Sequence, residues 1–88
     1  MTFRTTRMQL AIYLIAAEKL KLITCIQTNS SGSIEFIFDD PTGKGGFDEF
    51  NFNRGALVSA MALFVSHKYV RQMMTKAADK YAANTAAA

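Results

Sequence analysis

The residues best suited to chemistry lie in a glycine-rich stretch around Lys44. The run 43–46, Gly-Lys-Gly-Gly, invites comparison with a phosphate-binding loop, in which a lysine and backbone amides surround a phosphate. That loop needs Ser or Thr directly after the lysine and a second glycine five residues before Gly43. The chain has Gly45 after the lysine and lacks the earlier glycine. We therefore interpret 43–46 as a flexible loop.

Two further residues have side chains that catalyse reactions in other proteins. His67 follows Ser66, but adjacent residues of a helix do not face each other, and no acid stands at a spacing that would orient the imidazole. Cys25 alternates with Ile23 in an apolar run, which is typical of an inert buried thiol. One His and one Cys also exclude a conventional structural zinc site. We therefore expect no enzyme and no cofactor.

Two pairs of acidic residues flank the glycine-rich stretch. Asp39-Asp40 and Asp48-Glu49 could coordinate a hard cation, or they could form a solvated acidic rim. Their spacing differs from that of an EF-hand loop. We expect no metal site.

Length and composition favour one folded domain. The chain has 88 residues, of which 50% are hydrophobic and 19% charged, which is too apolar for a disordered tail. Cleavage of a signal peptide after Ala16 or Ala17 would place Leu14 or Ile15 at a position that needs a small residue. A single cysteine fits a reducing compartment. We expect a cytoplasmic protein without a membrane span.

Hydrophobic spacing predicts a helix followed by a hairpin. A helix over 7–19 begins with a capping box between Thr6 and Gln9. Residues 22–28 and 34–39 alternate as strands around a polar turn, and 3–5 could add a short edge strand. Because strand side chains alternate, we expect Leu22 and Cys25 to lie on opposite faces of the strand over 22–28. The aromatic side of 34–39 should pack on helices, and its Glu35/Asp39 side should meet water or a partner.

A loop over 40–52 should connect the hairpin to a second helix. Because large apolar side chains are unfavourable in water, we expect Phe47, Phe50 and Phe52 to contact the core or a second subunit. They are the candidate partner contacts. Asn53 is a good N-cap for the helix that follows.

The second helix should run over 54–81. Its apolar residues recur every four positions, at Leu57, Met61, Val65, Tyr69, Met73, Ala77 and Tyr81. Such a helix is about 42 Å long, whereas a domain of this size is roughly 30 Å across. Therefore the helix breaks near 66–68, frays at its end, or has its overhang covered by a second subunit. We favour the second subunit. Residues 82–88 should form a flexible Ala-rich tail.

The net charge is +3 and is unevenly distributed. Residues 35–50 are acidic, whereas both ends are basic, which suggests complementarity within or between chains, or a basic face for a polyanion. The candidate polyanion contacts are Arg4, Arg7, Lys68, Arg71, Lys76 and Lys80.

Residues 3–38 contain Phe3-x-Thr5-Thr6, Leu10-Ala11-x-Tyr13-Leu14, Leu20-x-Leu22 and a hairpin ending Ile34-x-Phe36-x-Phe38. With these motifs the chain resembles a family of short uncharacterised bacterial and phage proteins, with looser similarity over 47–74. Arg7 stands where that family often has Asp. The resemblance implies an intracellular setting, with a mobile element as one possibility, and transfers no functional residues.

Together these patterns predict an α+β domain over 1–81: a helix, an antiparallel hairpin and a long C-terminal helix, completed by homodimerisation. We expect a non-enzymatic protein–protein interaction protein, with an unidentified protein as partner besides itself. The alternative is a nucleic-acid-binding homodimer that uses the basic residues of the helices.

Overall fold

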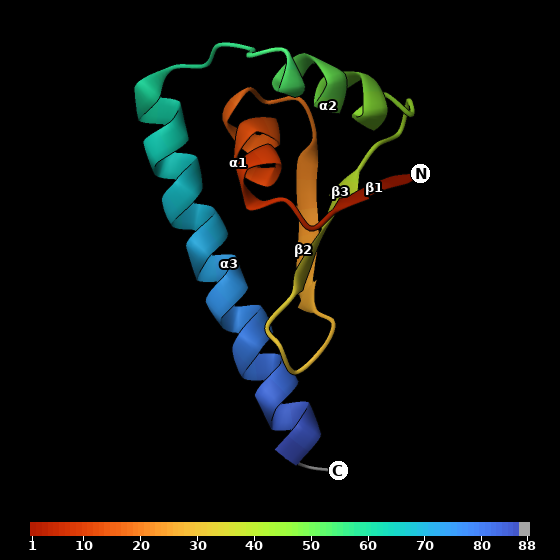
Figure 1. Ribbon diagram of the computed structural model, residues 1–88, viewed down its shortest axis with the longest axis vertical. Coiled ribbons are helices and arrows are strands. Elements are labelled where there is room, and N and C mark those ends of the chain that lie inside the picture. Colours follow the sequence, from red (N-terminus) through yellow and green to blue (C-terminus); the bar gives the residue numbers. More distant parts are fainter. Residues whose placement is uncertain (87–88) are drawn as a thin grey trace.

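The computed structural model describes residues 1–86 and has the predicted α+β architecture (Figure 1). Its elements, in chain order, are β1 (Thr2–Thr5), α1 (Met8–Ala16), β2 (Lys21–Gln27), β3 (Ile34–Asp39), α2 (Gly45–Asn53) and α3 (Ala60–Ala86). The longest dimension of the molecule is 43 Å, set by α3.

The predicted hairpin is present, within a sheet of three antiparallel strands in the order β1-β3-β2. The edge strand considered at 3–5 is β1, which pairs with the free side of β3 and places Phe3 opposite Phe38. Because β3 is now the central strand, only β1 and β2 remain as edges.

A bulge in β2 corrects the predicted side-chain faces of that strand. Leu22 lies opposite Phe38, and Cys25 lies opposite Phe36, with the register shifted between residues 22 and 24. The extra residue reverses the two-residue alternation, so side chains on either side of it point to the same face. Leu22 and Cys25 therefore both join the core, and the prediction that they face opposite ways was wrong.

The core lies between the sheet and the helices α1 and α3. Figure 1 shows α1 between α3 and the strands, and α3 packs against both α1 and β2. The largest fully buried side chains come from all three layers: Leu10, Leu14, Phe36, Phe38 and Val70. The prediction that the aromatic side of β3 packs on helices is confirmed.

Both ends of α1 differ from the predicted bounds. The predicted capping box is wrong, since the N-cap is Arg7 and no side chain caps the helix. The Arg7 backbone N–H instead donates to Thr5 Oγ1 at 3.1 Å. The helix ends at Ala16 because the backbone turns at Glu18, whose φ is +55°. The Glu18 N–H donates to the Ile15 carbonyl at 3.0 Å and closes the last turn of the helix.

The predicted loop over 40–52 contains a helix, α2. The buried Asp40 carboxylate accepts hydrogen bonds from the N–H groups of Lys44 and Gly45, both at 2.9 Å, and so satisfies the amides at the start of the helix. Gly45 packs tightly, since a Cβ there would lie 2.8 Å from the Cβ of Phe3 and closer still to its ring. Asn53 ends α2 and is not the N-cap of the long helix.

The long helix begins later than predicted. Gly55 has φ +87° and turns the chain after α2. Ser59 Oγ then accepts from the Ala62 N–H at 3.2 Å, at the start of α3. The helix is continuous through 66–68, and its last turns extend past the hairpin (Figure 1). The tail predicted over 82–88 begins inside α3, and residues 87–88 lie outside the described part of the chain.

Candidate interaction surface

The structure separates the residues that could do chemistry. Lys44 stands at the N-terminus of α2, but the Asp40 carboxylate already occupies the helix amides that a phosphate would need. His67 is exposed on α3, whereas Ser66 beside it is buried. Cys25 is buried in β2, and desolvation raises the pKa of its thiol. These side chains do not form one site.

The acidic pairs divide between the interior and the surface. Asp40 and Asp48 are buried, whereas Asp39 is exposed and Glu49 lies half-buried beside Arg7. The suggested solvated rim was therefore wrong for two of the four residues. Within residues 1–86, no three His, Cys, Asp or Glu side chains are grouped as a metal site would require.

The three candidate Phe contacts have different surroundings. Phe52 packs against the core, with its ring centroid 5.3 Å from that of Tyr13 and the Arg7 guanidinium 5.3 Å from its own centroid. Phe47 and Phe50 remain 66% and 55% exposed, and Phe50 is covered in part by the Arg54 guanidinium at 5.5 Å. Of the three, Phe52 contacts the core, whereas contact of Phe47 and Phe50 with a second subunit stays a prediction.

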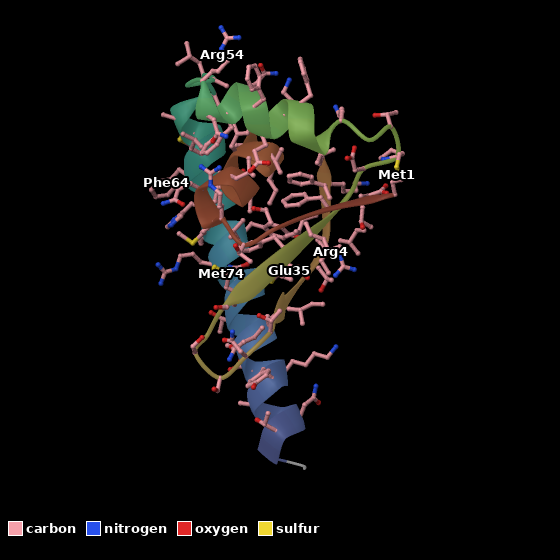
Figure 2. The ribbon with its side chains drawn as sticks, turned by 45° about the vertical axis from the view of Figure 1, so that its right-hand side comes forward. Met1, Arg4, Glu35, Arg54, Phe64 and Met74 are labelled. Atoms are coloured by element: carbon pink, nitrogen blue, oxygen red, sulfur yellow. The ribbon has the colours of Figure 1, made fainter. Side chains whose placement is uncertain are left out.

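The candidate polyanion contacts do not converge. Arg4 pairs with Glu35 at 3.1 Å on the outer face of the sheet (Figure 2). Arg7 pairs with Glu49 at 3.5 Å and donates to Asn53 Oδ1 at 3.0 Å. Glu35 is therefore paired within the chain, and its contact with another subunit stays a prediction. The other four residues are exposed on successive turns of α3: Lys68, Arg71, Lys76 and Lys80.

An apolar groove of about 620 Å³ lies between α1, α2 and the start of α3. The residues that line it are Gln9, Ile12, Tyr13, Phe52, Ala56, Val58, Ala60, Leu63, Phe64 and His67. Most of these side chains are apolar, and the volume is in the range of pockets that bind ligands or anchoring side chains. Phe52, one of the candidate partner contacts, thus lines a groove that could not be located from the sequence.

Next to the groove, four apolar side chains form what we call the apolar band. They are Leu57, Met61, Phe64 and Val65, which are between 62% and 96% exposed. Phe64 belongs to both the band and the groove and lies on the outline of the molecule (Figure 2). Polar residues follow the band along α3 at Lys68 and Gln72. An exposed apolar patch with polar surroundings is typical of an interaction site.

The spacing of four residues contained a signal for the band. Leu57, Met61 and Val65 belong to the predicted apolar stripe, but its spacing does not show which of its members are buried and which are exposed. Only its later members, among them Met73 and Ala77, pack against the core.

Comparison of the chain with protein-family models, with curated proteins and with solved structures gave no match. Among the helices within residues 1–86, none combines the length and apolar character needed to cross a membrane.

Proposed function

We propose that this chain is a non-enzymatic protein–protein interaction protein that works as a homodimer, joined through the apolar band. The observation that carries the proposal is the exposure of Leu57, Met61, Phe64 and Val65 together, on one end of α3 and the segment before it. Large apolar side chains exposed side by side are stabilised when a second surface removes them from water.

The size of the band fits a moderate self-association. The exposed fractions of its four side chains together equal about three fully exposed side chains. Burying a large apolar side chain contributes about 1.5–3 kcal/mol, so burying the band contributes roughly 5–9 kcal/mol per chain. Two chains would gain roughly 10–18 kcal/mol, which is comparable to or larger than the association cost of roughly 4–15 kcal/mol.

A second copy is the occupant that the band supports best. A two-fold axis brings the same patch of both chains together, so an apolar patch is its own complement. The band and the groove adjoin at Phe64, and each chain therefore offers both a protruding side chain and a concave surface next to it.

The alternative, a nucleic-acid-binding homodimer, has less support. It needs the basic residues to act together, and Arg4 and Arg7 are already engaged with carboxylates on different elements. No observation within the described residues favours it over the interaction protein.

Sedimentation equilibrium of the full chain, from about 1 to 100 µM, tests the proposal. We expect the mass to rise from that of one chain towards that of two. Val65→Glu should weaken association at least tenfold, because a charge would be buried in the interface. The control is Gln72→Glu, which places the same charge on an exposed position of the same helix.

The mass of a single chain throughout this range would refute the homodimer. Equal effects of Val65→Glu and Gln72→Glu would refute the band as its interface, since the two variants differ in position and not in charge added. Circular dichroism of both variants would establish that α3 is still formed.

A further inference from the structure

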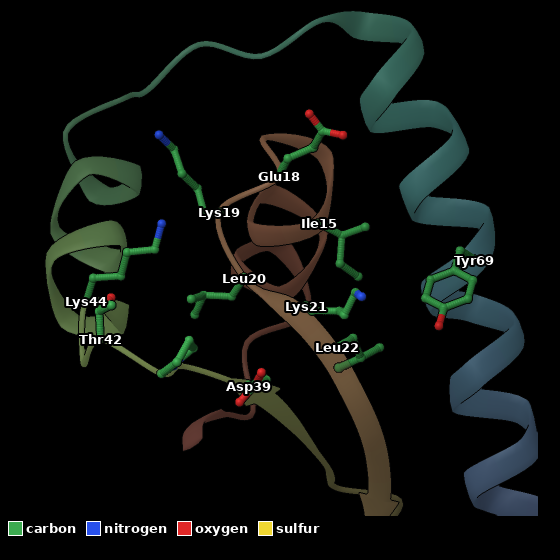
Figure 3. Close-up of a pocket in the computed structure, with 11 residues that line it drawn as sticks. Ile15, Glu18, Lys19, Leu20, Lys21, Leu22, Asp39, Thr42, Lys44 and Tyr69 are labelled. Carbon is green, nitrogen blue, oxygen red and sulfur yellow. The ribbon is translucent and has the colours of Figure 1, made fainter. Parts of the chain in front are cut away.

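A second cleft, at the C-terminal end of α1, is lined by lysines from three segments (Figure 3). It has a volume of about 630 Å³ and lies between the end of α1, the start of β2 and the loop from β3 to α2. Lys19 precedes β2, Lys21 begins it and Lys44 stands at the start of α2. The fold, not the sequence spacing, brings Lys44 to the other two.

None of the three ammonium groups forms an ion pair within residues 1–86. The ion pairs formed by residues in the described part are Arg4–Glu35 and Arg7–Glu49, and neither involves this cleft. Like charges gathered in one cleft repel each other, and an anion between them would relieve that repulsion. Two carboxylates, those of Glu18 and Asp39, also line the cleft, so three positive charges face two negative ones. This balance favours a single phosphate group over a polyphosphate.

The lysine side chains, and not backbone amides, must hold the phosphate. The Lys44 and Gly45 N–H groups, which a phosphate would contact at the start of α2, already donate to Asp40. The hydroxyl group of Thr42 lines the cleft and is available as a further donor. In Figure 3, Lys19, Lys44 and Thr42 lie on the same side of the cleft.

The opposite side of the cleft is mostly apolar. Ile15, Leu22 and Tyr69 line it, and Tyr69 reaches it from α3 (Figure 3). Lys21 and Glu18 also lie on this side. The aromatic ring is partly exposed and can contact the flat face of a ligand. The cleft therefore combines a cationic end with an apolar end, as pockets for small organic anions do.

The turn that ends α1 positions the first lysine of the cleft. Glu18, which directly precedes Lys19, has φ +55°, a conformation usually occupied by glycine at the end of a helix. We propose that this cleft binds a small phosphate monoester whose organic part is aromatic or apolar.

Titration of the ¹⁵N-labelled full chain with phenyl phosphate, followed by NMR, tests this proposal. We expect saturable amide shifts at residues 19–22, at 42–44 and at Tyr69, with a dissociation constant of about 1 mM or lower. The double substitution Lys19→Gln and Lys44→Gln should weaken binding at least tenfold. The matched control, Lys68→Gln with Lys76→Gln, removes the same charge from exposed positions of α3 and should leave binding unchanged.

Three outcomes would overturn the proposal. Shifts that do not saturate would show that the cleft is no binding site, and equal weakening by both double substitutions would show non-specific attraction to a positive chain. If inorganic phosphate binds as tightly as phenyl phosphate, the apolar end plays no part. The test reads out residues outside the apolar band, so its failure leaves the proposed dimer unaffected.

Discussion

Replacement of Asp40 by Asn should detach the start of α2 from the end of β3. The two carboxylate oxygens accept one hydrogen bond each, from the N–H groups of Lys44 and Gly45, both at 2.9 Å. The side chain is buried, so water cannot take its place without a local opening. An Asn side chain has one acceptor oxygen, and its NH₂ group would face the second backbone N–H.

The magnitude follows from these two hydrogen bonds. A hydrogen bond to a charged group contributes about 1.5–3 kcal/mol, and a buried amide left without a partner costs about 1–3 kcal/mol. Asp40→Asn retains one neutral hydrogen bond, so we expect a loss of about 2–4 kcal/mol in the free energy of unfolding. In a domain of this size that loss lowers Tm by roughly 10–30 °C.

Urea denaturation followed by far-ultraviolet circular dichroism measures this loss. The control is Asp39→Asn, one residue earlier, where the side chain is exposed and forms no hydrogen bond or ion pair with residues 1–86. It should change the free energy of unfolding by less than about 0.5 kcal/mol. Equal effects of the two substitutions would refute the role assigned to the Asp40 carboxylate.

Three other predictions use matched positions. Gly45→Ala should destabilise the fold by about 1–3 kcal/mol through overpacking, whereas Gly46→Ala, which has open space around it, should be neutral or stabilising in urea denaturation; similar values would contradict the packing. Phe38→Ala should cost about 3–5 kcal/mol and the exposed Phe47→Ala less than about 0.5 kcal/mol, compared by thermal unfolding; a large loss at Phe47 would mean that its side chain is buried in solution. Burial raises the pKa of Cys25, so above about pH 9 the unfolded thiol ionises while the native thiol stays protonated. The free energy of unfolding should therefore fall more steeply with pH than in Cys25→Ala, and parallel pH profiles would contradict the raised pKa.

The order of elements could be predicted because it follows local patterns. The two-residue alternation of 34–39 and the turn residues before it indicated the hairpin, and Phe36 and Phe38 are buried as predicted. The bulge in β2 could not be predicted, since it depends on the register with β3. The side of the sheet on which Cys25 lies therefore required the structure.

The helix α2 was missed for a different physical reason. Its sequence begins with two glycines, Gly45 and Gly46, which have low helix propensity. Tertiary contacts outweigh that propensity: Asp40 binds the first amides, and Phe52 packs against the core. Neither contact is visible in the local sequence.

The apolar band shows why the burial of the stripe along α3 could not be predicted from its spacing alone. A spacing of four residues advances about 40° around a helix at each step, so the stripe rotates by about 160° between Met61 and Ala77. One stripe therefore supplies two surfaces. Ala77 is buried and Met73 packs beside it, which turns Met61 and Val65 to the outside. The same rotation that turns Ala77 into the core thus leaves an apolar surface at the other end of α3, and this is the surface that we propose for the homodimer.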